Sequence, residues 1–501
     1  MASSETSLSP TNTSGQLLRG SELEKNLENN HQTDSPLVDP NEVAWDGNDR
    51  ENVRNGSKAR KWFICLTLTS ATFELTALSS AWGEANDEIV EHFGVGDEVG
   101  RLGLSLYLLG MGVGPLFCAP LSEFYGRRPL YWAGLIAFFA FQFMTAFPNN
   151  IGTALVGRFL SGMGGSVFLS NVPGTFADLF EKHQLGLPMA IFSLGPFLGP
   201  GGGPVIAGFI VQHAGYRWVF YVFLIWSFAL TVTIIFLIPE TSPAILLKKK
   251  AKRLRKETGN QNLYAPIERQ DASLLQAIRL NCRRPVQLLF TEPVLFVLCF
   301  YTGFLLAVIY LLFVAFPLVF SVVYEFEVQW VGLSFAAVTV GMALGAATFP
   351  FWRNLHQKAV AKNSGIMEPE FRLPQMTAGA VISPIGLFMF AWTIYRSVHW
   401  MVPIVATGIF GFGCYLTFNG ILTYTVEAYR PYAASAIAAN VFVRSVIGCT
   451  SPLFGVQMLN GIGFHWAISL LGFVSALLCP SAFVFRMYGK QLRQKSKYAL
   501  K

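Results

Sequence analysis

Residues 195–208 read GPFLGPGGGPVIAG and lie inside an apolar stretch, 187–211, that is long enough to cross a lipid bilayer. Glycine at this density removes side chains from a helix face, so that another helix can approach it closely. Pro196, Pro200 and Pro204 each remove one backbone hydrogen bond, which bends or softens a helix. The stretch therefore predicts a hinge or a tightly sealed helix contact in a membrane protein with several spans.

The composition of the whole chain supports this interpretation. The 501 residues are 52% hydrophobic and 13% charged, whereas soluble domains carry about 25% charged residues. Apolar windows of about 20 residues recur in two groups of six: 62–82, 102–121, 130–147, 152–173, 187–211 and 218–238, then 293–320, 330–350, 375–395, 400–424, 432–458 and 464–485. They predict an all-α polytopic membrane protein with twelve transmembrane helices in two six-helix bundles.

The polar stretches divide the chain into five segments. The N-terminal residues are rich in Ser, Asn, Thr and Glu and lack the apolar core of a signal peptide. The predicted segments are a disordered cytoplasmic tail (1–60), an N-terminal six-helix bundle (61–239), a cytoplasmic central loop (240–291), a C-terminal six-helix bundle (292–487) and a basic cytoplasmic tail (488–501).

The distribution of Lys and Arg predicts the orientation, because short cytoplasmic loops are enriched in these residues. With the N-terminus inside, the inner short loops hold Arg127, Arg128, Lys182, Arg353, Lys358, Lys362, Arg372 and Arg430, and the outer loops only Arg101, Arg217 and Arg396. The outer loop after the first span is acidic, with Glu84, Asp87, Glu88, Glu91, Asp97 and Glu98. Both termini are therefore predicted to be cytoplasmic. The net charge of +7 fits an anionic membrane leaflet and requires no nucleic acid.

The residues that carry chemistry in enzymes and metalloproteins form no recognisable pattern. The seven cysteines lie in predicted spans or in the central loop, and no pair has the spacing of metal ligands. The glycine-rich segments lie within spans and not after strands, which excludes a phosphate-binding loop. We therefore predict no enzyme, no metal site and no cofactor.

Three charged residues lie well inside the predicted spans, where a charge is costly. They are Glu74, Arg158 and Arg444. Glu74 in the first span and Arg158 in the fourth are expected at similar depth, and such a pair would make Glu74 sensitive to proton access from either side. We therefore predict that Glu74 and Arg158 couple transport to protons. The alternative is a static ion pair that holds two helices together.

The remaining candidates are polar or aromatic side chains inside spans. Arg444, in the eleventh span, either faces the transport pathway or bonds to backbone carbonyl groups. Other candidates for the cavity wall are Asn171, Tyr301, Tyr310, Asn419 and Asn440. For each of these the alternative role is a helix-packing contact.

Four stretches together resemble the major facilitator superfamily, in its fungal drug:proton antiporter branch with twelve spans. The residues GPLFCAPLSEFYGRR (114–128) resemble the loop signature between spans two and three, and RFLSGMGGS (158–166) the fourth-span signature. Residues 195–203 resemble the fifth-span antiporter signature. The segments EPEFRLP (368–374) and YTVEAYRPYAASAIAANVFVRSVIG (424–448) resemble the multidrug and polyamine branch. Glu123 and Glu427 stand where Asp is expected.

The resemblance implies roles for these residues. It implies a gating loop formed by Gly114, Glu123, Gly126, Arg127 and Arg128, and a role of Arg158 in proton transfer. It further implies an antiporter helix with Gly195, Pro196, Gly199, Pro200, Gly202 and Gly203. The two bundles would enclose the substrate site between them.

The function predicted from these features is proton-coupled efflux of small amphiphilic compounds such as drugs, toxins or secondary metabolites. The alternatives are a polyamine exporter, an uncoupled facilitator or importer of a nutrient, and a transport-fold sensor. The expected location is the plasma membrane, with the vacuolar membrane as second choice. The expected partners are a small-molecule substrate, protons and the lipid bilayer, and one chain suffices for a pathway.

Overall fold

A computed structural model describes residues 41–45, 49, 51–181, 184, 186–269, 274–364 and 367–499. Its residues form two compact units. The larger unit comprises Gly47–Leu246 and Asp271–Lys501, and the smaller unit comprises Met1–Asp46 and Leu247–Gln270. Residues 1–40, 46–48 and 50 of the predicted tail lie outside the described residues.

The described secondary structure is almost entirely helical, as predicted. The first half of the larger unit contains α2 (Lys58–Phe93), α3 (Asp97–Tyr125), α4 (Arg127–Ala146), α5 (Ile151–Gly165), α6 (Val167–Leu179), α7 (Gly186–Ala214) and α8 (Tyr216–Leu237). The second half contains α11 (Pro293–Tyr324), α12 (Val328–Ser334), α13 (Ala336–Ala347), α14 (Phe349–Lys362), α15 (Leu373–Ala391), α16 (Met401–Ala428), α17 (Ala433–Ile462) and α18 (Phe464–Lys495).

Shorter elements complete the described chain. Helices α9 (Pro243–Thr258) and α10 (Leu274–Thr291) lie in the segment predicted as the central loop. Four 3₁₀ helices are η1 (Val53–Asn55), η2 (Pro266–Arg269), η3 (Pro369–Arg372) and η4 (Arg430–Tyr432).

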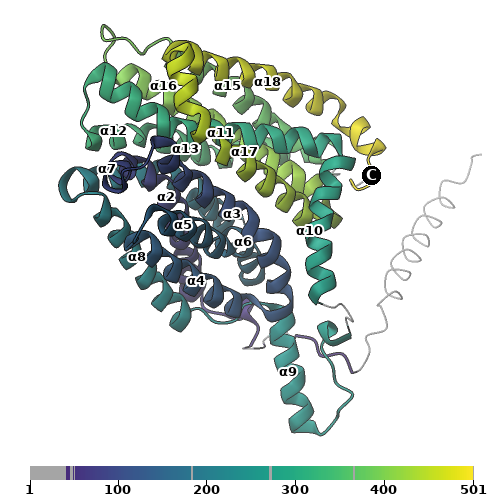
Figure 1. The fold of residues 1–501 in the computed structure, drawn as a ribbon. Coiled ribbons are helices and arrows are strands. Elements are labelled where there is room, and N and C mark those ends of the chain that lie inside the picture. Colours follow the sequence, from purple (N-terminus) through teal and green to yellow (C-terminus); the bar gives the residue numbers. More distant parts are fainter. Residues whose placement is uncertain are drawn as a thin grey trace, which may run out of the picture. The chain divides into compact units, whose positions relative to one another are not determined.

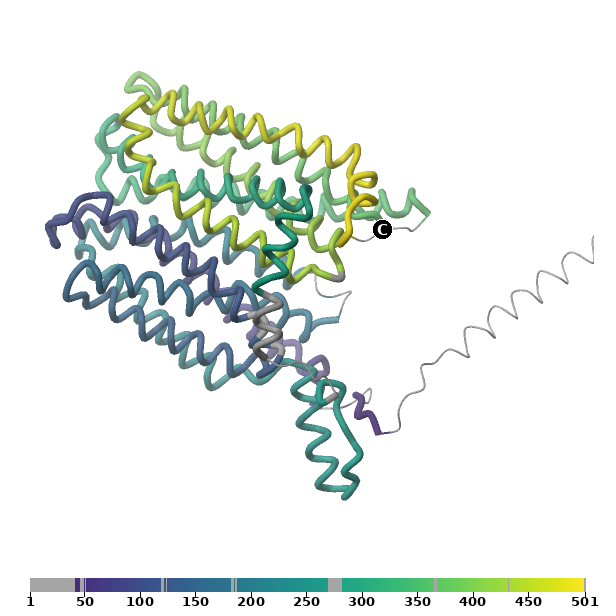
Figure 2. Tube along the Cα trace, turned by 45° about the vertical axis from the view of Figure 1, so that its right-hand side comes forward, coloured from purple at the N-terminus to yellow at the C-terminus, as the bar shows by residue number. Residues whose placement is uncertain are grey.

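Within the larger unit, the helices of the two halves form two groups that lie side by side. Figure 1 shows α2 to α8 in purple to teal and α11 to α18 in green to yellow, and the rotated view in Figure 2 shows the same division. We call the end with the α3–α4 turn the basic end, because Arg127 and Arg128 lie there. The opposite end, where α2 ends and α3 begins, is the acidic end, with Glu91, Asp97 and Glu98.

The number of spans agrees with the prediction once a helix break is considered. Among the described residues, 11 helices are long and apolar enough to cross a membrane. The predicted span 152–173 is divided between α5, with 15 residues, and α6, with 13 residues. Ser166 lies between them with near-helical dihedral angles, so the two short helices together supply the twelfth crossing.

Helix α2 is longer than its predicted span. The acidic residues after position 82 were expected in a loop, but Glu84 and Glu91 are part of the 36-residue helix. At 1.5 Å per residue this helix is about 54 Å long, well beyond the roughly 30 Å hydrocarbon layer. The helix ends only at Gly94, whose φ of 60° is readily adopted by glycine.

Helix α7 contains the glycine-rich stretch and packs backbone to backbone against α2. Pro196, Pro200 and Pro204 all lie inside the helix, which continues from Gly186 to Ala214. A Cβ atom at Gly199 would overlap the Thr76 side chain, and one at Gly203 would overlap the Ala77 carbonyl group. The predicted tight helix contact is therefore present in the structure.

The smaller unit has its own apolar cluster. Val43, Ala251 and Ala265 form its buried centre. Glu42 pairs with Tyr264 in a parallel β-bridge, and the Lys250 ammonium group donates to the Ala44 carbonyl oxygen at 3.0 Å. A segment before the first span thus associates with the segment between the halves.

Candidate functional site

Glu74 is enclosed in the first half of the larger unit. Its side chain is 1% exposed, and its Oε1 accepts a hydrogen bond from the Ser227 hydroxyl group of α8. Gln142 of α4 donates to the same hydroxyl oxygen at 2.6 Å. The second carboxylate oxygen of Glu74, Oε2, has no hydrogen-bond partner in the part of the chain that the structure describes. Glu74 is therefore a buried carboxylate with one oxygen free to take a proton.

Arg158 is fully buried in α5 and bonds to backbone carbonyl groups. Its Nε donates to the Gly103 oxygen at 3.0 Å, and its two terminal nitrogens donate to the oxygens of Leu78 and Ser79 at 3.0 and 2.9 Å. The guanidinium group also lies 4.1 Å from the centre of the Tyr107 ring. Arg158 thus ties α5 to α2 and α3.

The predicted ion pair between Glu74 and Arg158 is not formed. No ion pair joins these two described side chains, because one Glu74 oxygen accepts from Ser227 and the Arg158 nitrogens donate to backbone carbonyl groups. The physical reason is that the carbonyl groups of α2 and α3 approach Arg158 closely enough to use its donors. The two residues still share an environment, because Tyr107 interacts electrostatically with both.

The α3–α4 turn brings an unpredicted carboxylate into the basic end. Gly126 has a φ of 97° and a ψ of 173°, a conformation that side chains disfavour. The Glu240 carboxylate lies against it and accepts from the backbone N–H groups of Arg127 at 2.9 Å and Arg128 at 3.1 Å. It also accepts from the N–H groups of Thr241 and Ser242. Glu240 therefore caps the N-terminus of α4, where a negative charge is favourable.

The side chains of Arg127 and Arg128, the two arginines of the predicted gating loop, contact other residues of the first half. Arg127 forms an ion pair with Asp178 of α6 at 3.4 Å and donates to the Ser122 hydroxyl oxygen at 3.0 Å. Arg128 stacks on Trp132 with its guanidinium carbon 4.5 Å from the ring centre. These contacts join the ends of α3, α4 and α6.

Burial raises the pKa of Asp178, which lies beyond the predicted span 152–173. The pKa of its carboxyl group is raised from 3.8 to about 6, because burial disfavours the charged form. The nearby Arg127 and Arg54 act in the opposite direction, and Glu240 adds to the increase.

The other gating-loop residues lie in α3. A Cβ atom at Gly114 would overlap the Ser166 side chain, so Gly114 allows α3 to approach the junction of α5 and α6. The side chain of Glu123 lies outside the described residues.

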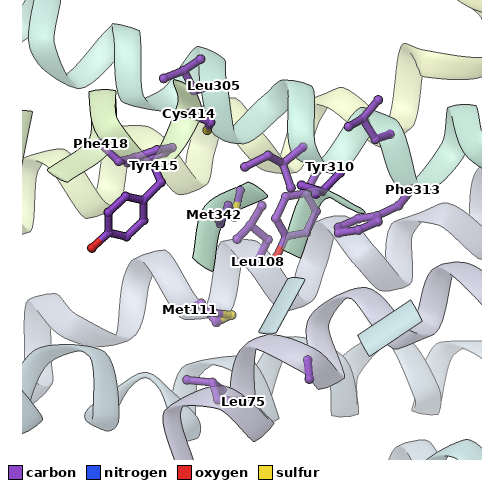
Figure 3. Packing of buried hydrophobic residues seen from close by; sticks show 14 of the residues in the cluster. Leu75, Leu108, Met111, Leu305, Tyr310, Phe313, Met342, Cys414, Tyr415 and Phe418 are labelled. Carbon is purple, nitrogen blue, oxygen red and sulfur yellow. The ribbon is translucent and has the colours of Figure 1, made fainter. Parts of the chain in front are cut away.

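Aromatic and apolar side chains from both halves meet near the middle of the larger unit. Tyr310 of α11 is hydrogen-bonded to Ser79 of α2 at 2.7 Å. Phe197 of α7 packs against Tyr415 and Phe418 of α16, with ring centres 5.1 and 5.5 Å apart. Figure 3 shows Tyr310, Tyr415 and Phe418 among these side chains. The halves are therefore joined by a largely apolar contact with few polar groups.

Of the other predicted cavity residues, Asn171, Tyr301 and Asn440 are buried, whereas Asn419 is partly exposed. Asn171 is fully buried and both polar atoms of its amide lack a partner, as does the Tyr301 hydroxyl group. Asn440 donates to the Thr302 hydroxyl oxygen at 2.8 Å, whereas its own side-chain oxygen is unpartnered. Asn419 donates to Gln375 at 3.3 Å and thus links α16 to α15.

Arg444 differs from Arg158. Its side chain is partly exposed, its Nε atom is enclosed without a hydrogen-bond partner, and its guanidinium carbon lies 5.7 Å from the centre of the Phe418 ring. The structure places Arg444 in α17 near Phe418 of α16, with no backbone carbonyl bonded to it among the described residues.

Among the described residues, three ion pairs hold the basic end of the second half. Glu370 binds Arg493 of α18 at 3.0 Å, and Glu368 binds Lys490 of the same helix at 2.6 Å. Arg372 binds Glu427 of α16 at 2.9 Å. The segment 368–374 therefore holds the ends of α16 and α18 together.

Comparison with known proteins identifies the family. The sequence profile of the Major Facilitator Superfamily matches residues 63–452. The chain belongs to the major facilitator superfamily. It is therefore a multi-pass membrane protein of a transporter family.

Two fungal relatives match most of the chain. The chain is 44% identical over 465 residues to the "Probable drug/proton antiporter YHK8" of Saccharomyces cerevisiae, covering 92% of this chain and 88% of that protein. It is 48% identical over 395 residues to the "Efflux pump atB" of Aspergillus terreus, covering 78% of this chain and 83% of that protein.

Solved structures of other members have the same fold. The xylose transporter XylE from E. coli in an inward open conformation gives a TM-score of 0.60 at 15% identity, covering 84% of this chain and 95% of that one. A bacterial homologue of the human lysosomal transporter Spinster gives 0.59 at 13% identity, covering 88% and 99%. At these identities the likeness concerns the fold alone.

The sequence did not point to three residues of these sites. Glu240 and Asp178 lie at the basic end, and Ser227 is hydrogen-bonded to Glu74. A signal existed for Glu240, which lies between two prolines directly after the sixth span. None existed for Ser227, an ordinary polar residue in an apolar helix.

Proposed function

We propose that this chain is a proton-coupled exporter of small amphiphilic compounds, such as drugs, toxins or secondary metabolites. The relatives named as a drug/proton antiporter and an efflux pump support this proposal. We further propose that it acts as a monomer in the plasma membrane with both termini in the cytoplasm.

The observation that carries the proposal is the state of Glu74. It is a buried carboxylate with one oxygen bonded to Ser227 and the other without a partner. An ionised carboxylate in such a place is costly, and protonation of the free oxygen removes that cost. Glu74 thus offers a place for one exchangeable proton within the membrane.

In the proposed cycle, the charge of Glu74 determines which arrangement of the halves is favoured. The ionised carboxylate accepts from Ser227, which in turn accepts from Gln142. Protonation of the free oxygen removes the charge of Glu74, which weakens the hydrogen bond that Ser227 donates and with it the link between α2, α4 and α8. Contacts of Arg127 and Arg128 at the basic end would stabilise one of the two arrangements.

The test is uptake of a panel of fluorescent amphiphiles into proteoliposomes under an imposed pH gradient. Wild type should accumulate a compound only when the lumen is acidic, because protons must leave as the compound enters. Glu74→Gln should abolish this gradient-driven accumulation while the protein remains folded. Ser227→Ala is the matched control, because it keeps the carboxylate and should shift the pH dependence without abolishing transport.

Other outcomes support the alternatives. Movement of a compound regardless of the gradient would indicate an uncoupled facilitator. Preferential movement of polyamines would indicate a polyamine exporter, although the predicted spans hold one carboxylate, Glu74, against the two arginines Arg158 and Arg444. Normal pH dependence in Glu74→Gln would contradict the role of Glu74.

A further inference from the structure

We infer that Arg444 binds the anionic group of the transported compound, so that amphiphilic organic anions are the preferred substrate class. The inference rests on the proposed export function and specifies its substrate.

The position of Arg444 on α17 places it toward the protein interior. Residues three and four apart share one face of a helix, and Asn440, Gly448 and Ser451 share the face of Arg444. These three neighbours are buried. A Cβ atom added to Gly448 would lie 2.9 Å from the Leu108 side chain of α3 and 3.0 Å from the Leu306 side chain of α11. Arg444 thus lies on the face of α17 that meets both α11 and the first half.

The guanidinium group of Arg444 has no hydrogen-bond or ion-pair partner among the described residues. Its enclosed Nε atom donates to nothing, and no described carboxylate forms an ion pair with it. Arg158 provides the contrast within the same molecule, because all three of its donor positions are occupied by carbonyl oxygens. A charged donor left without a partner in an apolar setting is costly.

Three carboxylates of the larger unit contact groups other than Arg444. Glu74 accepts from Ser227 in the first half. Glu370 and Glu427 pair with Arg493 and Arg372 at the basic end. The positive charge of Arg444 is therefore available for a ligand, and an anion is the ligand that lowers its energy most.

The surroundings of Arg444 fit the apolar part of an amphiphile. The Phe418 ring lies 5.7 Å from its guanidinium carbon, and Phe197 of the first half packs on Phe418. Tyr310 interacts electrostatically with Arg444 and packs on Phe313, with ring centres 5.1 Å apart. A positive group beside aromatic rings of the second half, one of which packs on Phe197 of the first half, suits a compound with an aromatic body and a carboxylate or sulfonate.

The experiment compares probes that differ only in charge. Naphthalene-2-sulfonate, naphthalene-2-sulfonamide and 2-naphthylmethylammonium, with the anthracene and pyrene analogues of each, are offered to proteoliposomes with an acidic lumen. The vesicles contain only phosphatidylcholine, so that no anionic lipid headgroup competes for Arg444. Wild type should accumulate a sulfonate about tenfold faster than its sulfonamide, since one ion-paired hydrogen bond is worth about this factor.

The variants separate binding from folding. Arg444→Gln should slow the sulfonate by about tenfold and leave the sulfonamide nearly unchanged. Arg444→Lys keeps the charge and should keep part of the preference. An equal loss for both probes would indicate a structural role and contradict the inference.

The wild-type rates distinguish this inference from the proposed function. Gradient-driven uptake of the sulfonamides or ammonium compounds above that into protein-free vesicles, where amines accumulate passively in the acidic lumen, without preference for the sulfonates would overturn the anion site and leave proton-coupled export standing. Failure of every probe in every ring series would contradict the proposed function as well.

A measurement on wild type avoids dependence on the variants. Phenylglyoxal labels accessible arginines, and mass spectrometry locates the label. Naphthalene-2-sulfonate should protect Arg444 and the sulfonamide should not, while the fully buried Arg158 should remain unlabelled throughout. An Arg444 that does not react, or that the sulfonate does not protect, would contradict the inference.

Discussion

At the scale of single residues, two arginines inside the membrane have opposite surroundings. Arg158 is buried and satisfied by carbonyl groups of α2 and α3. Arg444 is partly exposed with an unpartnered Nε atom. The first arrangement stabilises the fold, because each hydrogen bond to a charged group contributes about 1.5–3 kcal/mol. The second leaves a charge available for binding.

Arg158→Lys should destabilise the protein. A single ammonium group cannot reach the separated oxygens of Gly103, Leu78 and Ser79 as a guanidinium group does. We expect a loss on the order of 3 kcal/mol, measured as a lower melting temperature of the detergent-solubilised protein. Arg444→Lys is the matched control and should leave the melting temperature nearly unchanged. Equal effects of the two substitutions would contradict this distinction.

Asp178 predicts a pH dependence of stability. Its pKa in the folded protein is raised to about 6, so the folded state retains this proton more strongly than the unfolded state. The contribution of Asp178 therefore falls as pH rises from about 4 to about 6. Relative to Asp178→Asn, wild type should lose melting temperature between about pH 4.5 and about pH 7. A rise in the melting temperature of wild type relative to Asp178→Asn over this pH interval would contradict the raised pKa of Asp178.

At the scale of helices, α7 makes close contacts on two sides. Gly195, Gly199 and Gly203 face α2, whereas Gly201 faces Thr339 of α13 in the second half. Gly208 lies against Gly332 of α12, since a Cβ atom added to Gly208 would be 3.2 Å from the Gly332 Cα atom. One helix thus belongs to the core of the first half and to the contact between the halves.

Gly203→Ala should impair folding, because the added methyl group would overlap the Ala77 carbonyl group and force α2 and α7 apart. Such overpacking costs about 1–3 kcal/mol. The expected result is a lower melting temperature and a lower yield of folded protein by size-exclusion chromatography. Gly461→Ala in α17 is the control, since its added methyl group would meet no atom within 4 Å. An unchanged melting temperature of Gly203→Ala would show that α2 and α7 accommodate the methyl group without loss of stability.

At the scale of the whole molecule, the halves touch at the acidic end as well as at mid-depth. Gln457 of α17 donates to Glu98 of α3 at 2.6 Å. Gly83 of α2 faces Phe313 of α11, and a Cβ atom added to this glycine would lie 3.5 Å from the Phe313 side chain. A transporter that alternates between its two sides must break such contacts in each cycle.

A covalent link at this point should therefore stop transport. Cysteines at positions 98 and 457, introduced into a variant without the native cysteines, are joined with a short bis-methanethiosulfonate reagent, because two cysteine side chains are shorter than the Glu98 and Gln457 side chains that meet at their tips. We expect gradient-driven uptake to fall to background after cross-linking and to recover after reduction. Each single-cysteine variant is the control and should keep its uptake after treatment with the reagent. Undiminished transport in the cross-linked protein would show that the acidic end does not open.

The parts of this molecule that the sequence predicts are those determined by local composition. The spans follow from the apolar length that a bilayer requires, and the helix contact of α7 follows from its glycines. The partners of Arg158 were not predictable, because the positions of the Leu78, Ser79 and Gly103 carbonyl groups depend on packing. The cap of Glu240 on α4 joins residues 113 positions apart, a distance over which a local pattern carries no information.

The glycine faces of α7 also have a mechanical consequence. When helices interdigitate through large side chains, relative movement requires these side chains to leave the grooves in which they pack. Gly201 and Gly208 present no side chains to the second half. We therefore expect a small displacement of α12 and α13 along α7 to meet less steric resistance than a displacement between helices with large interdigitated side chains.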